Sequence, residues 1–162
     1  MSNSNTTKAT ISHHAAAAKA VRAFMKAQGI KGAVKASRSA GTSSIRVSLT
    51  NGTPSQTATV TEFAKQYQYG HFDGMYDSYE FSNCIEGLPQ VKYVFVEAEF
   101  DTETKQKALD ALCTEFNLPA MVYESAPYDV TICGEKQNTY SAMRAVLLGS
   151  HYPHVPLWEV AA

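Results

Sequence analysis

The sequence predicts an α+β fold, a two-layer sandwich in which helices pack on one face of a mostly antiparallel sheet. Segments with apolar residues three or four apart, typical of amphipathic helices, are interspersed with short segments of alternating apolar and polar residues, typical of half-buried strands. The expected order is α-β-β-α-β-α-β-β-α, in which a helix does not follow every strand as it would in a doubly wound parallel fold. A length of 162 residues and a hydrophobic content of 44% suit one globular domain. We place this domain at residues 12–150, between a flexible N-terminal tail (1–11) and an extended C-terminal tail (151–162).

The first helix and a β-hairpin are expected in the basic N-terminal part. Ser12 can cap the helix, and Gly29 ends it. Two alternating segments follow at 33–39 and 43–50, joined by a turn at 40–42 (Ala-Gly-Thr). This pattern predicts a hairpin with one buried and one solvated face.

The middle of the chain is expected to hold a helix, a loop and a strand. The second helix begins at Thr53-Pro54, where a capping residue precedes proline at the first helical position, and ends near Tyr69-Gly70. Residues 71–83 (HFDGMYDSYEFSN) have no stable period and are expected to form a structured loop with room for a short strand. Residues 91–100 (VKYVFVEAEF) form the strongest expected strand, because β-branched and aromatic residues fill its first half.

The last part is expected to hold two helices around two short strands. Asp101 or Thr102 caps the third helix, and residues 117–119 (Asn-Leu-Pro) terminate it. Short strands are expected at 121–124 and 129–133, followed by a helix at about 139–148.

Charge divides the chain into two parts. The first acidic residue is Glu62, and eight Lys and Arg residues precede it. The part from Glu62 onward holds the other six cations and all 15 carboxylates, so the two parts carry +8 and −9 although the whole chain carries −1. A surface of one sign attracts oppositely charged molecules over about a Debye length. The charge pattern therefore predicts a binding partner rather than a reaction.

The first candidate site is the set of basic residues on the expected helix and hairpin. Lys and Arg beside small hydroxyl side chains are the groups that contact phosphates, and they give a salt-dependent affinity that is indifferent to sequence. The alternative is that these cations pair with carboxylates of the acidic part and form an ordinary mixed surface. No aromatic residue is interleaved with the hairpin cations, so the sequence gives little support for stacking on single-stranded bases. The candidate residues are Lys19, Arg22, Lys26, Lys35, Arg38 and Arg46.

The second candidate site is the loop at 70–80. Its carboxylates and histidine could hold a divalent cation or supply a general acid and base. The spacing is not that of a calcium-binding loop. The alternative is a turn in which aromatic rings pack on the sheet and aspartates cap backbone N–H groups. The residues concerned are His71, Asp73, Gly74, Asp77, Tyr79 and Glu80; no catalytic residue is assigned and the metal is unknown.

Composition and motifs limit the classes of function. No apolar run approaches the ~20 residues that span a bilayer, and the N-terminus lacks the apolar region of a secretory signal. Three cysteines without CxxC spacing indicate reduced thiols rather than a disulfide framework. We therefore expect a cytoplasmic protein that has no membrane segment. The absence of a P-loop, a dinucleotide fingerprint and a nucleophile elbow leaves an enzyme unsupported, and no cofactor is expected.

Four segments carry a resemblance to a known family: 43–47 (SSIRV), 51–54 (NGTP), 70–80 (GHFDGMYDSYE) and 91–96 (VKYVFV). Together, over about residues 15–100, they resemble large polyvalent protein-associated domain 29, which occurs in proteins of phages and conjugative elements. FDGM-x-D-x-YE is the most specific piece. Glu97 and Glu99 stand in a region where members tend to have a basic residue.

The resemblance implies a small accessory protein of a mobile element, one that counters host defences or accompanies entering DNA; it implies no established activity. With the basic residues, this leads us to expect a non-enzymatic binding protein whose partner is nucleic acid or a host defence protein. A metal-assisted hydrolase or nuclease centred on the loop at 70–80 is the alternative. Self-association through the oppositely charged parts, giving a homo-oligomer, is a third hypothesis.

Overall fold

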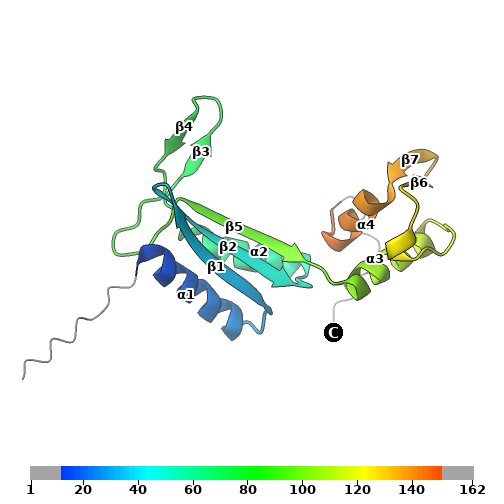
Figure 1. Ribbon diagram of the computed structural model, residues 1–162, viewed down its shortest axis with the longest axis horizontal. Coiled ribbons are helices and arrows are strands. Elements are labelled where there is room, and N and C mark those ends of the chain that lie inside the picture. Colours follow the sequence, from blue (N-terminus) through cyan, green and yellow to red (C-terminus); the bar gives the residue numbers. More distant parts are fainter. Residues whose placement is uncertain (1–11, 151–162) are drawn as a thin grey trace, which may run out of the picture. The chain divides into compact units, whose positions relative to one another are not determined.

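The structure, a computed structural model, describes residues 12–150 (Figure 1). It confirms the α+β class: within these residues four α-helices and seven strands alternate in nearly the expected order, and the strands form small sheets. The tails expected at 1–11 and 151–162 lie outside the described residues. The described residues divide into two compact units, the first holding 12–48 with 60–97 and the second holding 49–59 with 98–150. The single domain expected over 12–150 stays a prediction.

A three-stranded sheet forms the centre of unit 1. Its strands β1 (Gly32–Ser39), β2 (Thr42–Thr50) and β5 (Tyr93–Glu99) lie in the order β1-β2-β5. β1 and β2 are the predicted hairpin. Its turn residues Ala40 and Gly41 have φ values of 46° and 80°, and positive φ at both central positions is the geometry of the tight type I′ turn.

β5 runs parallel to β2. At one end of the pair the amide of Lys92 donates to the carbonyl of Ser43 at 3.1 Å, and at the other the amide of Asn51 donates to the carbonyl of Glu99 at 2.8 Å, so both strands advance in the same direction. The connection between them is a crossover that contains the helix α2 (Pro54–Lys65). The crossover places two distant stretches of sequence side by side.

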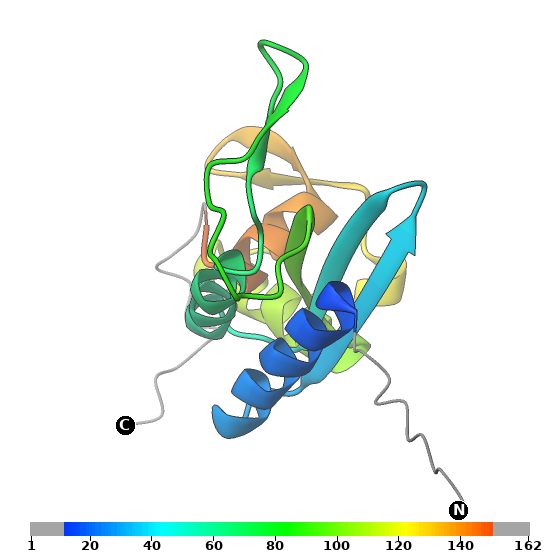
Figure 2. The same cartoon turned by 90° about the vertical axis from the view of Figure 1, so that its left-hand side faces the viewer.

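The helices α1 (His13–Ala27) and α2 lie on the same side of this sheet (Figure 2). The rings of Phe24 and Phe63 join the two helices, with centroids 3.9 Å apart and planes inclined by 4°. The buried apolar side chains between the two helices and the sheet are Ala17, Ala18, Val21, Met25, Val34, Ile45, Val47, Val60 and Ala64. Among the described residues of unit 1 no helix covers the other side, which we call the open face; Lys35 of β1 and Arg46 of β2 mark it.

The expected loop at 71–83 contains a hairpin. β3 (His71–Asp73) and β4 (Ser78–Glu80) pair antiparallel, with Phe72 opposite Tyr79. Gly70 permits the pairing, because a Cβ atom at this position would collide with the carbonyl oxygen of Glu80. The glycine is therefore required by close approach of two backbones.

Unit 2 holds α3 (Thr102–Glu115), a 3₁₀ turn (Tyr123–Ser125), the antiparallel pair β6 (Asp129–Ile132) and β7 (Glu135–Asn138), and α4 (Thr139–Leu147). Asp101 caps α3, since its side chain accepts from the amide of Thr104 at 2.7 Å. The buried cluster of this unit is Ala98, Phe100, Ala108, Leu109, Leu112, Cys113, Val130, Ile132, Ala142, Met143, Val146 and Leu147.

The prediction of a strand at 121–124 is wrong. The side chain of Gln106 satisfies this backbone instead: its Nε2 donates to the carbonyl of Met121 at 2.9 Å, and its Oε1 accepts from the amide of Tyr123 at 2.8 Å. The segment therefore needs no neighbouring strand. The partner of β6 is β7, reached through Cys133 and Gly134 at φ values of 53° and 84°. No helix in residues 12–150 has the length and the apolar character needed to cross a membrane.

Candidate nucleic-acid interface

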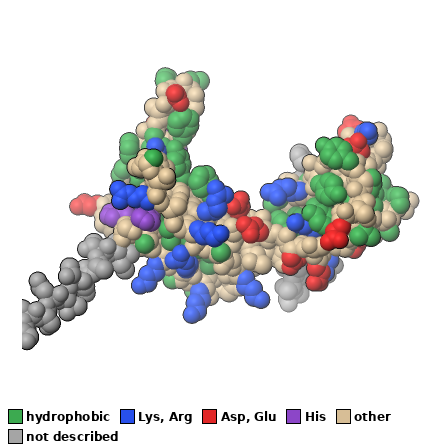
Figure 3. All heavy atoms as spheres, in the orientation of Figure 1, with side chains coloured by type: hydrophobic (Ala, Val, Ile, Leu, Met, Phe, Trp, Pro, Cys, Tyr) green, Lys and Arg blue, Asp and Glu red, His purple; other side chains and the backbone are tan. Residues whose placement is uncertain are grey.

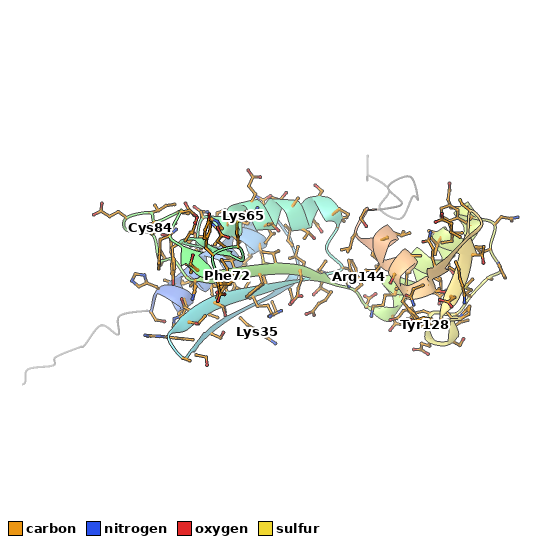
Figure 4. All side chains as sticks on the ribbon, turned by 90° about the horizontal axis from the view of Figure 1, so that it is seen from above. Lys35, Lys65, Phe72, Cys84, Tyr128 and Arg144 are labelled. Atoms are coloured by element: carbon orange, nitrogen blue, oxygen red, sulfur yellow. The ribbon has the colours of Figure 1, made fainter. Side chains whose placement is uncertain are left out.

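Two of the predicted cations, Lys35 and Arg46, project from the open face. Their strand neighbours Val34, Ile45 and Val47 are buried on the helix side, so alternation puts both cations on the other side. Lys35 lies on the side of the sheet away from α2 (Figure 4). Both are exposed, as the sequence predicts.

The other predicted cations lie on α1 or on the helix-facing side of β1. Lys19, Arg22 and Lys26 are exposed on α1, and Arg22 reaches the sheet edge, where its Nη2 donates to the carbonyl of Val34 at 2.6 Å. Arg38 is exposed near the end of β1. It is in phase with Val34 and Ala36, so its side chain lies on the opposite face of the strand from Lys35. The six cations therefore surround the edge strand β1 rather than sharing one flat surface.

A shallow pocket of about 490 Å³ lies among the α1 cations, with Arg22, Lys26 and Lys31 in its lining. Lys31 was missed as a candidate because it lies between the expected helix and hairpin and has no periodicity to place it. Figure 3 shows Lys and Arg side chains gathered over the part of unit 1 that holds α1, β1 and β2, and hydrophobic side chains over the β3–β4 hairpin.

Carboxylates neutralise few of these cations. Arg46 Nη1 lies 3.0 Å from Glu97 Oε1, and both side chains are about half exposed, at 55% and 44%. For Lys19, Arg22, Lys26, Lys35 and Arg38, no carboxylate of the described part of the chain lies within 4.0 Å. Over the described residues of unit 1 (12–48 and 60–97), nine Lys and Arg face six Asp and Glu, a net charge of +3 (9 − 6). The mixed-surface alternative therefore holds for Arg46 alone of the six.

The open face also carries aromatic rings beside Arg46, which the sequence analysis missed. Val94 and Val96 line a pocket with Thr61 of α2, so Tyr93 and Phe95, which alternate with them, face the other way. The guanidinium of Arg46 lies 5.2 Å from the centroid of the Phe95 ring. Phe95 is 45% exposed, and its centroid is 6.0 Å from that of Tyr93, with planes inclined by 24°. The alternation in 91–96 could have predicted that Tyr93 and Phe95 share one face of their strand. It could not have predicted that β2, which carries Arg46, is the neighbouring strand.

The rings continue into the base of the β3–β4 hairpin. Tyr79 meets Tyr93 edge to face at 5.7 Å and Phe81 at 5.4 Å, and Phe81 stacks on Tyr69 at 5.4 Å. We call these five rings, Phe95, Tyr93, Tyr79, Phe81 and Tyr69, the aromatic row. At 68%, Phe81 is the most exposed side chain of the row.

Lys92 and Tyr79 fix the centre of the aromatic row. Lys92 Nζ lies 4.9 Å from the Tyr79 centroid and 5.5 Å from that of Tyr93, within the range of cation–π attraction. The Tyr79 hydroxyl donates to the carbonyl of Lys92 at 2.5 Å. Burial, with a smaller contribution from Tyr69 and Tyr93, raises the pKa of Tyr79 to about 12, so the hydroxyl keeps its proton and its role as donor at neutral pH.

The side chains of the second candidate site are used within the hairpin. His71 Nε2 lies 3.5 Å from Glu80 Oε2, and His71 Nδ1 lies 3.0 Å from the Ser82 hydroxyl. Asp73 Oδ1 accepts from the amides of Met75 and Tyr76, at 2.8 and 3.4 Å, which is a turn-capping arrangement.

The rest of this candidate set forms the turn or the aromatic row. Asp77 occupies the left-handed region at φ 48°, Gly74 is exposed at the tip, and Tyr79 lies in the aromatic row. Within residues 12–150, no three His, Cys, Asp or Glu side chains come together as a group that could hold a metal ion. The arrangement is that of a structural turn.

Of three comparisons with known proteins, one found a match, and it is to a family model. No curated protein matches the chain, and no solved structure matches it. The family model for large polyvalent protein associated domain 29 matches residues 12–108, more than half of the chain. The matched region includes α1, the three-stranded sheet, the β3–β4 hairpin and the whole aromatic row. The resemblance expected from the sequence is thereby confirmed, and the chain belongs to the large polyvalent protein associated domain 29 family.

Proposed function

We propose that this protein is a non-enzymatic accessory protein of a phage or another mobile element, and that it binds nucleic acid through the cations of unit 1 in the host cytoplasm. Membership of the large polyvalent protein associated domain 29 family supports the mobile-element context. The observation that carries the proposal is that five of the six predicted cations have no carboxylate partner within the described residues.

Cations without carboxylate partners can neutralise phosphates, and this releases condensed counterions from the nucleic acid. The logarithm of the binding constant then falls linearly with the logarithm of the salt concentration. The slope is about −0.9 per phosphate contact on duplex DNA and about −0.7 on single strands. Exposed Lys and Arg on a helix and on a strand suit backbone contacts, which position a protein without reading sequence.

Charge reversal tests the proposal. In the triple variant Lys35→Glu, Arg38→Glu, Arg46→Glu, fluorescence anisotropy with a labelled oligonucleotide should show loss of binding at about 50 mM salt, where such contacts are strong. The matched control is Lys107→Glu, Lys136→Glu, Arg144→Glu in unit 2, which changes the net charge equally and breaks only exposed ion pairs. If both variants lose affinity to the same extent, total charge alone governs binding and the proposed surface is wrong.

A host defence protein is the other partner class, and a pull-down from host lysate separates the two. Nuclease treatment should remove the material bound by the wild-type chain. A protein that stays bound after nuclease treatment, and is lost in the unit 1 variant, would replace nucleic acid as the partner.

A further inference from the structure

We propose that the open face of unit 1 binds single-stranded nucleic acid, with bases stacked on the aromatic row and phosphates contacted by the cations beside it. The proposal rests on the proposed function and names its ligand: a single strand rather than a duplex. Sequence patterns do not predict it, because the rings come from β5 and from the base of the hairpin while Lys35 and Arg46 come from β1 and β2.

Exposed rings on the open face and at the base of the β3–β4 hairpin are the first support. Phe95 and Phe81 are 45% and 68% exposed, and the half-buried Tyr93 and Tyr79 lie between them. Leaving such rings in water has a free-energy cost that a stacked base would relieve. In sheets that bind RNA, aromatic side chains on the open face stack two or three bases.

Charge complementarity is the second support. Two cations adjoin the row, Arg46 beside Phe95 and Lys92 beside Tyr79 and Tyr93. Lys35 lies on the open face two strands away from Phe95, on β1. In the proposed complex these cations contact phosphates of the strand whose bases stack on the aromatic row. The planar guanidinium of Arg46 can also stack on a base, as Arg does in single-strand sites.

The geometry favours a single strand over a duplex. In a duplex both faces of each base are covered by neighbouring pairs, at a rise of about 3.4 Å, so a protein ring meets a base face only if base pairs unstack. The centroids of Phe95 and Tyr93 are 6.0 Å apart. Successive bases stacked on these rings are separated more widely than in a duplex, and an unpaired strand can adopt this spacing without the cost of unstacking base pairs.

A comparison of single-stranded and duplex probes tests the inference. We would titrate the full chain and Phe95→Leu with fluorescein-labelled oligothymidylate, with oligouridylate, and with a duplex of mixed sequence. Leucine keeps apolar contact with the sheet but removes the flat π face, so affinity for the single strands should fall by about fivefold or more. Affinity for the duplex should be unchanged, and Phe95→Tyr should bind like the wild type.

Two matched controls separate stacking from general loss of apolar surface. Tyr76→Leu changes an exposed ring in the turn of the β3–β4 hairpin, outside the aromatic row, and Tyr128→Leu changes an exposed ring in unit 2; neither should affect binding. The oligothymidylate and oligouridylate arms distinguish DNA from RNA as the source of the strand.

The outcomes distinguish this inference from the proposed function. Equal affinity of the wild type for duplex and single strand, with no effect of Phe95→Leu but loss in the charge-reversal variant, overturns the inference and leaves the proposed function intact. If the wild type binds none of the probes at low salt, both are wrong.

Discussion

The guanidinium of Arg46 lies 5.2 Å from the centroid of the Phe95 ring, although a whole helix separates the two residues in the chain. The contact exists because the crossover through α2 returns the chain as a strand parallel to β2. Glu97, two residues further along the same face of β5, forms an ion pair with Arg46. Arg46 therefore contacts both the Phe95 ring, on which a base could stack, and the Glu97 carboxylate, which would repel a phosphate.

Replacing Glu97 by glutamine should strengthen nucleic-acid binding. The variant removes a negative charge 3.0 Å from Arg46 but keeps an oxygen that can accept its hydrogen bond. We expect a gain of about 1.4- to fivefold in affinity, which corresponds to the 0.2–1 kcal/mol typical of an exposed ion pair. The measurement is anisotropy at low and high salt. The control Glu86→Gln removes one carboxylate of the same unit away from the aromatic row and should change affinity less; an equal gain would assign the effect to net charge.

Local patterns were sufficient to predict most elements of the fold, because helical spacing and strand alternation are set by neighbouring residues. α1, the β1–β2 hairpin, α2, β5 and α3 all follow such patterns. β3 and β4 have three residues each, too few for a period to emerge. The strand expected at 121–124 failed because a distant side chain, Gln106, binds its backbone.

The candidate interface was only half predictable for a related reason. Burial of Val34, Ile45 and Val47 follows from alternation, so the exposure of Lys35 and Arg46 could be predicted. The pairing of β5 with β2 depends on the path of the crossover, which alternation does not encode. Sequence proximity therefore does not show that Phe95, which is distant in the chain, adjoins Arg46 in space.

Gly70→Ala should destabilise the fold by about 1–3 kcal/mol or more, the usual cost of forcing extra volume into a packed site. The new methyl group would meet the carbonyl of Glu80 and the ring of Tyr79, and neither can move without disturbing the hairpin or the aromatic row. Gly74→Ala is the matched control, because nothing lies within 4 Å of its Cβ position. Urea denaturation of both variants checks the difference. Similar midpoints for the two would show that the backbones of Gly70 and Glu80 are not in close contact.

Asp73→Ala should weaken the β3–β4 hairpin, by about 1 kcal/mol for the hydrogen bonds it makes to Met75 and Tyr76 amides. This loss should be the same with and without added magnesium or manganese, because the carboxylate serves the turn. Thermal unfolding of wild type and variant in each buffer is the measurement. A metal-dependent rise in Tm of the wild type that Asp73→Ala removes would instead support the metal-assisted alternative through binding linkage.

Asp101 should make stability depend on pH in the acid range. Its side chain accepts from Asn51 Nδ2 at 2.6 Å and from the Thr104 amide at 2.7 Å, and these hydrogen bonds lower the pKa of this carboxyl from 3.8 to about 2. A pKa lower in the folded than in the unfolded state means that the unfolded chain takes up protons first as the pH falls. The stabilisation is therefore complete above about pH 4 and is lost between about pH 4 and pH 2. Asp101→Asn should flatten this part of a plot of Tm against pH, while the same change at exposed Asp77 serves as the control for loss of one carboxylate. A slope that survives in Asp101→Asn would show that other carboxyl groups account for the acid sensitivity.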